Sequence, residues 1–324
     1  MGGLMQLSLP GAELVSIKFD GSKTAFGRHQ TFALRYGWLT KGYQALEASS
    51  KPHDVFAKDD ATISLGVGVN MVSSIRYWLG AFQVIDPNTF VSTELGTYIF
   101  DKKNGRDQYL EDEATLWLLH WALATNAELA TAWYWFFNKF HKAEFTGTEL
   151  ATALADWAKT NIKIKISSST IKTDASLILR MYTQSKGNTR TPIEDALDSP
   201  LSMLRLVTQT AGGRSYQSRP SPRQGLPTGI FGYAVTKLME MRNTTTVPVE
   251  ELMYSRDNFP ALGSVFRLTE SDLVTKLENM IAFIPDKYEI RETAGIHQLY
   301  KLNKVDALDY LEIHYASMER GVAA

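Results

Sequence analysis

Two short apolar stretches rich in tryptophan constrain the fold of this chain more than any other feature. They span Trp117–Leu123 and Trp133–Phe137. Neither approaches the roughly 20 apolar residues that a membrane-spanning helix needs. Polar residues also interrupt or border both stretches, at His120, Asn126, Glu128 and Asn138. The pattern therefore predicts two buried core helices in a globular, mainly helical protein.

The composition agrees with a globular protein. The chain has 324 residues, of which 44% are hydrophobic and 21% charged, and this length predicts two or three domains. It has no cysteine, which excludes disulfides, thiolate metal sites and cysteine nucleophiles. The N-terminus also lacks the charged start and apolar run of a signal peptide. We therefore expect a cytoplasmic protein.

The charge is close to balanced, but the acids are unevenly placed. A formal net charge of −1 argues against a protein that coats nucleic acid non-specifically, because phosphate binding needs clustered Lys and Arg. Acids are absent between Asp20 and Glu47 and between Asp198 and Glu240. These two runs contain Lys23, Arg28, Arg35 and Lys41, and Arg205, Arg214, Arg219, Arg223 and Lys237, respectively. They indicate local phosphate-binding patches, although chance scatter of the acids remains an alternative.

The segment from Asp59 to Phe100 has the parts of a winged helix-turn-helix. Asp59–Leu65 predicts a short helix, Gly66–Gly68 a turn, and a second helix begins near Asn70. Thr89–Phe100 could add a short strand and helix. The residues predicted to contact DNA from the second helix are Asn70, Ser73, Ser74 and Arg76. A plain helical hairpin fits the spacing equally well.

A second unit is predicted in the middle of the chain. Thr146 is a suitable cap for a helix through Trp157. Ser167–Asp174 then leads into an amphipathic helix ending near Tyr182, and it resembles recognition helices that carry a Ser-x-x-Thr-Ile-Arg-Arg-Asp motif. Lys172 is the predicted DNA contact, whereas Thr173 replaces the second basic residue of that motif. An ordinary capped helix remains the alternative.

The C-terminal third predicts a basic loop and a further hairpin. Residues 212–229 are rich in Gly, Pro and Ser and indicate a loop or linker. We expect its three arginines to contact the DNA backbone, namely Arg214, Arg219 and Arg223. Tyr288–Arg291 and Gln298–Lys301 predict a hairpin that follows a helix over Thr269–Ile281, as in another winged unit.

The expected fold class is thus mainly α with short β wings, as winged helix-turn-helix units joined by helical segments. We expect three domains. These are an N-terminal domain over 1–145 with a winged helix-turn-helix, a middle helical domain over 146–211, and a C-terminal helical domain over 212–324 that contains the hairpin.

No nucleotide-binding, protease or kinase motif marks a catalytic centre. His29 lies among cations and could move a proton, while Arg28, Arg35 and Lys41 could neutralise phosphate charge. A hydrogen-bonded structural histidine is the alternative. The carboxylates of Asp107, Glu111 and Asp112 could hold a divalent cation, or could favour the start of the following helix.

Several motifs resemble a bacterial family long known only as a domain of unknown function. They are AFGRHQTFALRYGWLTKGY (25–43), LGVGVNMVSSIRYW (65–78), LEDEATLWLLHW (110–121), DSPL (198–201), LPTGIFGYA (226–234) and ETAGIHQLY (292–300). They cover nearly the whole chain. Gln30 departs from the family pattern, which has Glu after the histidine, so any role of that acid cannot be carried over.

The resemblance implies a role in the Ssp DNA phosphorothioation system, which places sulfur in the DNA backbone as part of phage defence. It implies a DNA-nicking endonuclease that binds double-stranded DNA and works with a cysteine desulfurase, an ATPase and an ATP-pyrophosphatase-type enzyme. On this hypothesis the segment around His29 is the nicking site, and magnesium or manganese is the expected cofactor. The main alternative is a non-catalytic DNA-recognition module that recruits the sulfur-inserting enzymes. A transcription regulator is disfavoured because such proteins are usually smaller and act as dimers on matched half-sites.

Overall fold

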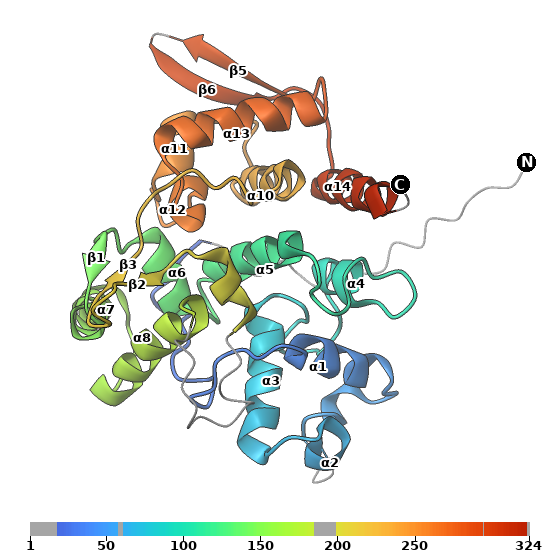
Figure 1. Ribbon diagram of the computed structural model, residues 1–324, viewed down its shortest axis with the longest axis vertical. Coiled ribbons are helices and arrows are strands. Elements are labelled where there is room, and N and C mark those ends of the chain that lie inside the picture. Colours follow the sequence, from blue (N-terminus) through green and yellow to red (C-terminus); the bar gives the residue numbers. More distant parts are fainter. Residues whose placement is uncertain (1–17, 58–60, 185–198, 294, 323–324) are drawn as a thin grey trace, which may run out of the picture.

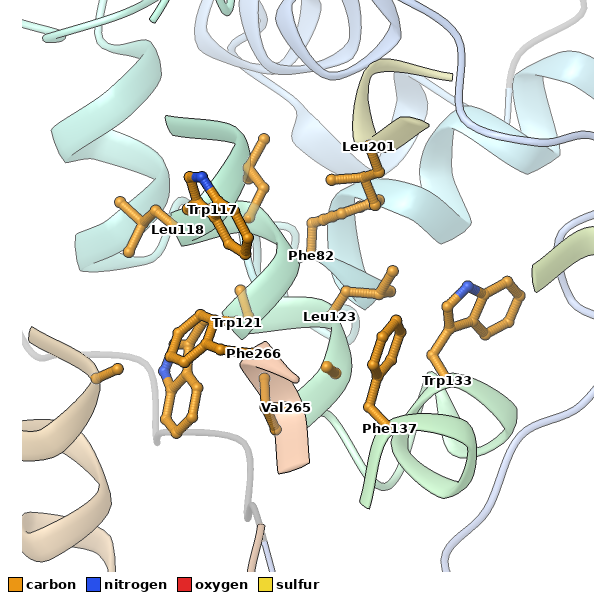
Figure 2. Close-up of a cluster of buried hydrophobic side chains, with 14 of the residues drawn as sticks. Phe82, Trp117, Leu118, Trp121, Leu123, Trp133, Phe137, Leu201, Val265 and Phe266 are labelled. Carbon is orange, nitrogen blue, oxygen red and sulfur yellow. The ribbon is translucent and has the colours of Figure 1, made fainter. Parts of the chain in front are cut away.

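A tryptophan-rich helix pair lies in the core of this computed structural model (Figure 1), as the sequence predicts. The structure describes residues 18–57, 61–184, 199–293 and 295–322. Helix α5 (Glu113–Thr125) is buried at every position after its first, and α6 (Thr131–Asn138) is buried throughout. Figure 2 shows Trp117, Trp121 and Leu123 of α5 among large apolar side chains from other parts of the chain. Both apolar stretches are therefore core helices.

The N-terminal part consists of four helices and one 3-10 turn in its described residues. They are α1 (Trp38–Glu47), η1 (Pro52–Asp54), α2 (Ala61–Leu65), α3 (Val69–Ala81) and α4 (Glu94–Phe100). The predicted pair of helices around Gly66 is thus present as α2 and α3, although residues 58–60 lie outside the described ranges. The alternating apolar and polar residues of Glu13–Phe19 predict a short strand, but this segment falls almost entirely on residues 1–17, which are also not described.

The strand expected at the start of Thr89–Phe100 is not formed. Between α3 and α4, residues that the structure describes in full, the only β pairing is the isolated bridge between Ile85 and Ser92. Thr93 instead caps α4, because its hydroxyl accepts the backbone N–H of Gly96 at 2.9 Å. The helix of this prediction is confirmed, but the flank of α3 carries no hairpin wing.

The middle part combines two helices with a small antiparallel sheet. Helix α7 (Gly147–Asn161) begins at a capping box formed by Thr146 and Glu149, as the sequence predicts. Helix α8 (Ser168–Tyr182) follows, and after it comes a 3-10 turn, η2 (Pro200–Leu204). The strands are β1 (Glu144–Phe145), β2 (Thr208–Gln209) and β3 (Tyr216–Gln217), in the order β1-β3-β2.

The stretch 212–229 is more ordered than a linker. It contains β3, which pairs with β1 and with β2, and its last residues begin α10 (Thr228–Met241). The strands are only two residues long, so no alternating pattern marks them in the sequence. Tertiary contacts, rather than local propensity, form this sheet.

The C-terminal part repeats the connectivity of the middle part around a second sheet. After α10 come β4 (Thr246–Pro248), α11 (Val249–Met253), α12 (Leu262–Phe266), α13 (Glu270–Phe283), β5 (Tyr288–Thr293), β6 (Ile296–Lys301) and α14 (Ala307–Val322). The sheet order is β4-β6-β5, and the β5–β6 hairpin lies over α13 (Figure 1). The chain thus runs helix, strand, helices, hairpin twice, once through α6–β3 and once through α10–β6.

One hydrophobic core joins the three segments predicted as domains. A single cluster of buried side chains extends from Leu34 to Tyr315. The first sheet also takes one strand from each segment, because β1, β2 and β3 fall within 1–145, 146–211 and 212–324. The division into three domains stays a prediction. In the parts of the chain that the structure describes, no helix is long and apolar enough to cross a membrane.

The fold class predicted from the sequence is confirmed at the level of a mainly helical protein with short β elements.

Candidate nucleic-acid interface

Helix α8 presents a row of polar and basic side chains to solvent. Ser167 caps the helix by accepting the backbone N–H of Thr170 at 3.1 Å. The opposite face is apolar and packs into the core, which fixes the orientation of the helix. The residues exposed along one line of the helix are Ser169, Lys172, Ser176 and Arg180. Their spacing of three or four residues places them on one face, which carries two cations and no acid.

Two further basic elements flank this helix in the sequence. Lys163 and Lys165 are exposed in the connection between α7 and α8. Arg214 is exposed in the loop that joins β2 to β3. Arg219, beyond β3, forms a salt bridge with Glu144 at 3.2 Å. Of the three arginines predicted in this loop, Arg214 is therefore the one best placed for a phosphate.

Arg223 does not fit the predicted phosphate contact. Its guanidinium donates to the backbone carbonyls of Arg205 and Arg219, at 3.4 and 3.2 Å, and its backbone N–H donates to Asp272. Burial lowers the pKa of this guanidinium. The hydrogen bonds of Arg223 thus hold the segment between β3 and α10 in place. The Pro-rich sequence around Arg223 does not indicate this role.

His29 is a buried structural residue rather than an exposed base. Its side chain is 1% exposed, and its Nε2 lies 2.8 Å from Oδ1 of Asp174, which is 0% exposed. The backbone N–H of Thr31 donates to Nδ1 at 3.1 Å, so Nδ1 is an acceptor and Nε2 carries the proton. Trp78 and Trp133 pack around the ring. A substrate phosphate cannot touch the buried ring in this conformation, so this geometry does not favour the predicted role of His29 as a catalytic base.

The His29–Asp174 bond instead positions the loop beside α8. Asp174 also accepts the backbone N–H of Gly27, at 3.1 and 3.2 Å. Gly27 lies so close to the start of α8 that an added Cβ would be 2.8 Å from Cγ2 of Thr170. Arg28, between these two anchored residues, is exposed. Figure 1 shows the loop running between α8 and α3.

Arg28 faces a hollow of about 510 Å³ between this loop, α3 and the α5–α6 connection. Ser73 and Arg76 of α3 line the same hollow, so the structure brings together residues from two separate predictions. Arg28 forms no salt bridge with any described residue. Lys23 lies at the rim and forms a salt bridge with Glu128 at 3.7 Å.

A second hollow of about 570 Å³ continues from the first. Both are lined by Lys23 and Glu128, and the second adds Lys18 and Lys163. We call the two hollows together the basic groove, lined by Lys18, Lys23, Arg28, Arg76 and Lys163. Its cations outnumber its acids, Asp20 and Glu128, so the groove suits an anionic backbone.

Other predicted residues lie elsewhere. Ser74 is 0% exposed and cannot reach a DNA groove, because it faces the core from α3. Asn70 is exposed at the start of α3 but does not line the basic groove. Arg35 lies over the rings of Phe32 and Trp38, and Lys41 is exposed on α1. The predicted cluster of His29 with Arg28, Arg35 and Lys41 is therefore not assembled.

The carboxylates predicted to bind a metal are used in the fold. Asp107 accepts the backbone N–H groups of Glu111 and Asp112 with its two oxygens, at 2.8 and 3.1 Å. Asp112 caps α5 through the N–H of Ala114, and the neighbouring His314, whose Nε2 lies 3.8 Å from Oδ2 of Asp112, lowers the pKa of this carboxyl. The described residues contain no group of three or more His, Asp or Glu side chains arranged to hold a metal ion. This trio therefore does not fit a magnesium site.

Three exposed residues of α8 were not among those predicted from the sequence, namely Ser169, Ser176 and Arg180. The signal was present, because these residues recur at helical spacing from Lys172 within an amphipathic segment. Lys18 and Lys163 were also missed, and for them no sequence signal exists. They meet only because the backbone N–H of Lys163 donates to the carbonyl of Gly21, which joins distant parts of the chain.

The chain is similar to a known protein family and to solved structures. The family model described as "Protein of unknown function (DUF4007)" matches residues 26–315. Two solved structures are similar, described as "Magnesium ion-bound SspB crystal structure" (TM-score 0.77) and "SspB crystal structure" (TM-score 0.76). Each shares 28% identity with this chain, covering 93% of it and 90% of the solved chain. No curated protein matches significantly. The family resemblance predicted from the motifs is confirmed.

Proposed function

This chain belongs to the DUF4007 family, and we propose that it recognises duplex DNA as a component of a DNA phosphorothioation system. The similarity to SspB structures over nearly the whole chain supports the system, because the family motifs imply the same assignment. The exposed row on α8 supports the DNA contact and is the observation that carries the proposal.

In this proposal the middle part acts as a winged helix-turn-helix. Its order of helix, strand, two helices and hairpin puts α8 in the position of a recognition helix and the β2–β3 loop in the position of the wing. A helix fits the major groove, where Lys172 and Arg180 can contact guanine or phosphate and Ser169 and Ser176 can bond to base edges. Arg214 in the wing then contacts the backbone.

The basic groove extends this surface. Because Gly27 touches α8 and Arg28 follows it, a duplex on α8 would pass close to Arg28 and Arg76. Phosphate contacts of this kind set the register of the protein on DNA without reading sequence.

The test is DNA affinity measured by fluorescence anisotropy at several salt concentrations. Lys172→Ala and Arg180→Ala should each weaken binding, by about 1–3 kcal/mol if the side chain contacts a base. If it contacts a phosphate, the salt slope should become shallower by about 0.9. Lys304→Ala is the matched control, because Lys304 is exposed in the C-terminal part. Unchanged affinity in both α8 variants would overturn the proposal.

Nicking of the bound DNA is a second candidate function, favoured by the position of Arg28. A guanidinium beside the DNA backbone can neutralise the charge that develops on a phosphate under attack. His29 does not supply the proton transfer, because it is buried and hydrogen-bonded at both nitrogens. Magnesium is bound in one similar SspB structure. In this chain, the predicted carboxylates do not fit that ion, and Glu128, the one acid among the described residues that line the hollow beside Arg28, pairs with Lys23.

A supercoiled plasmid separates the two functions. Purified protein is incubated with plasmid in magnesium, manganese or EDTA, and the open-circular product is measured. If the protein nicks at the basic groove, Arg28→Ala should slow the reaction about 100-fold, the size typical of losing one charge-stabilising donor. Its DNA affinity should change far less. Absence of nicking by the wild-type protein in every condition would instead support a recognition module that recruits other enzymes.

A further inference from the structure

The middle part (α6–β3) and the C-terminal part (α10–β6) have the same connectivity, but they carry different types of residue at equivalent positions. Helices α8 and α13 each begin after a hydroxyl cap, Ser167 or Thr269, that accepts the third N–H of the helix. Counted from these caps, the second, fifth, ninth and thirteenth residues are exposed in both helices. They are Ser169, Lys172, Ser176 and Arg180 in α8, and Ser271, Val274, Glu278 and Ala282 in α13.

This exchange removes the features that favour DNA. Both cations of the row are replaced by apolar residues, and one serine is replaced by glutamate. The wider composition follows the same trend, with eleven Lys and Arg against seven acids over 131–217, but eight against ten over 228–301. A glutamate repels phosphates and apolar side chains offer them no hydrogen bond, so this face of α13 is poorly suited to reading DNA.

An apolar groove lies beside the same face of α13. It has a volume of about 370 Å³ and is enclosed by α11, α13 and the β5–β6 hairpin. Val274 and Ile296 line it and are 41% and 52% exposed. We call it the C-terminal groove, and its lining includes Val249, Met253, Leu273, Val274, Ile290 and Ile296. Large apolar side chains that face solvent around one hollow mark an interaction site.

The charges at this groove indicate what it binds. Glu250, Glu270 and His297 line it, and none of the Lys and Arg residues that the structure describes does. Glu250 already pairs with Arg256, whereas Glu270 accepts only the weaker hydrogen bond of the Tyr254 hydroxyl at 3.3 Å among the bonds of the described residues. Glu270 and the nearby Glu278 on α13 therefore favour a positively charged occupant.

We propose that the C-terminal groove docks a segment of a partner protein in which apolar anchor residues are flanked by lysine or arginine. The anchors would enter between Val274 and Ile296, and the cations would meet Glu270 and Glu278. The molecule then has a basic helix for DNA and an acidic, apolar groove for protein. The inference rests on the proposed function only for the role of α8, since the chemistry of the groove stands by itself.

The test is a selection of random 12-residue peptides displayed on phage against the full-length protein. Peptides with apolar anchors and flanking Lys or Arg should be enriched, and should bind more weakly at high salt. Val274→Glu and Ile296→Glu should weaken the same peptides about tenfold or more, as expected when a buried anchor is lost. Ile313→Glu is the matched control, because Ile313 is 40% exposed on α14.

Three results would overturn the inference. They are no enrichment, enrichment of acidic peptides, and enriched peptides that bind the groove variants as tightly as the wild type. Concentration-dependent dimerisation that Ile296→Glu abolishes would assign the groove to a second copy of this chain instead. Circular dichroism checks that each variant is folded.

DNA affinity keeps this inference separate from the proposed function. Val274→Glu should leave DNA affinity unchanged even if Lys172→Ala lowers it. If Val274→Glu weakens DNA binding as strongly as Lys172→Ala, then α13 contacts DNA and the inference fails. If Lys172→Ala has no effect while the peptide results hold, only the DNA-binding role of α8 fails.

Discussion

At the residue scale, the buried pair of His29 and Asp174 accounts for the shape of the loop that carries Arg28. Gln30 and Thr31 have positive φ angles of 51° and 66°, a backbone conformation that costs side-chain-bearing residues about 1–3 kcal/mol. The bonds of His29 to Asp174 and of Thr31 N–H to His29 hold them there. His29 and Asp174 therefore act by holding the loop that positions Arg28.

Asp174→Asn tests this positioning role. The amide oxygen of asparagine can still accept from His29 and from Gly27, so we expect folding, DNA affinity and any plasmid nicking to remain close to wild type. Asp174→Ala leaves buried donors without partners and should lower the free energy of unfolding by about 1–3 kcal/mol. Loss of nicking in a folded, DNA-binding Asp174→Asn protein would show that the carboxylate charge takes part in catalysis.

At the scale of elements, the segment from β2 to α10 contains arginines with two different roles. Arg214 lies in the exposed β2–β3 loop, while Arg223 is held by two backbone carbonyls. The sequence presents both in the same Gly- and Pro-rich stretch. Their roles differ because Arg214 lies in the exposed loop between two strands of the short sheet, whereas the segment with Arg223 packs against α13.

Arg214→Ala and Arg223→Ala should therefore have opposite effects. Arg214→Ala should make the salt dependence of DNA binding shallower by about 0.9 and leave stability unchanged. Arg223→Ala should lower the free energy of unfolding by about 1–3 kcal/mol, because two carbonyls lose their donor, without changing the salt slope. Anisotropy titrations and urea unfolding measure the two quantities. A shallower slope in Arg223→Ala would return that residue to the DNA surface.

At the scale of the whole molecule, His120 links the three segments predicted as domains. It lies on α5 at 0% exposure, with Nδ1 2.8 Å from the hydroxyl of Tyr182 and Nε2 2.9 Å from the carbonyl of Val265. The carbonyl can only accept, so Nε2 carries a proton. Burial lowers the pKa of His120 from 6.5 to about 3.

This histidine should make the stability of the protein depend on pH. Above pH 6.5 neither state is protonated and its contribution is fully present. As the pH falls towards 3 the unfolded chain takes up a proton that the folded protein refuses, so stability is lost at about 1.4 kcal/mol per pH unit. Urea unfolding at pH 7 and pH 5 should differ by roughly 2 kcal/mol more in wild type than in His120→Gln.

The same experiment tests the shared core. Tryptophan fluorescence and circular dichroism should give one coincident transition if the core unfolds as a unit. Separate transitions would support the three predicted domains. An equal pH dependence in wild type and His120→Gln would contradict the role given to His120.

Most helices could be predicted because their signals are local. The capping box at Thr146, the serine cap of α8 and the start of α13 at Thr269 all depend on residues within one turn. The β5–β6 hairpin was also predicted, since Tyr288–Arg291 and Gln298–Lys301 flank a turn that contains Gly295. The two-residue strands β1, β2 and β3 could not be, because nothing in so short a segment distinguishes a strand from a loop.

By itself, then, the sequence determined a mainly helical protein with tryptophan-rich core helices, a capped and basic α8, and the motifs of its family. Only the tertiary structure decided which cations are available to a ligand. In the folded protein His29 and Ser74 are buried, and Arg223 is held by hydrogen bonds to backbone carbonyls. Arg28 and Arg76 line one hollow, and Lys18 and Lys163 line the other. The reason is physical, because helix caps and amphipathic faces depend on neighbours in the chain. The exposure and ion pairing of a side chain depend instead on segments that are distant in the sequence and that only folding brings together.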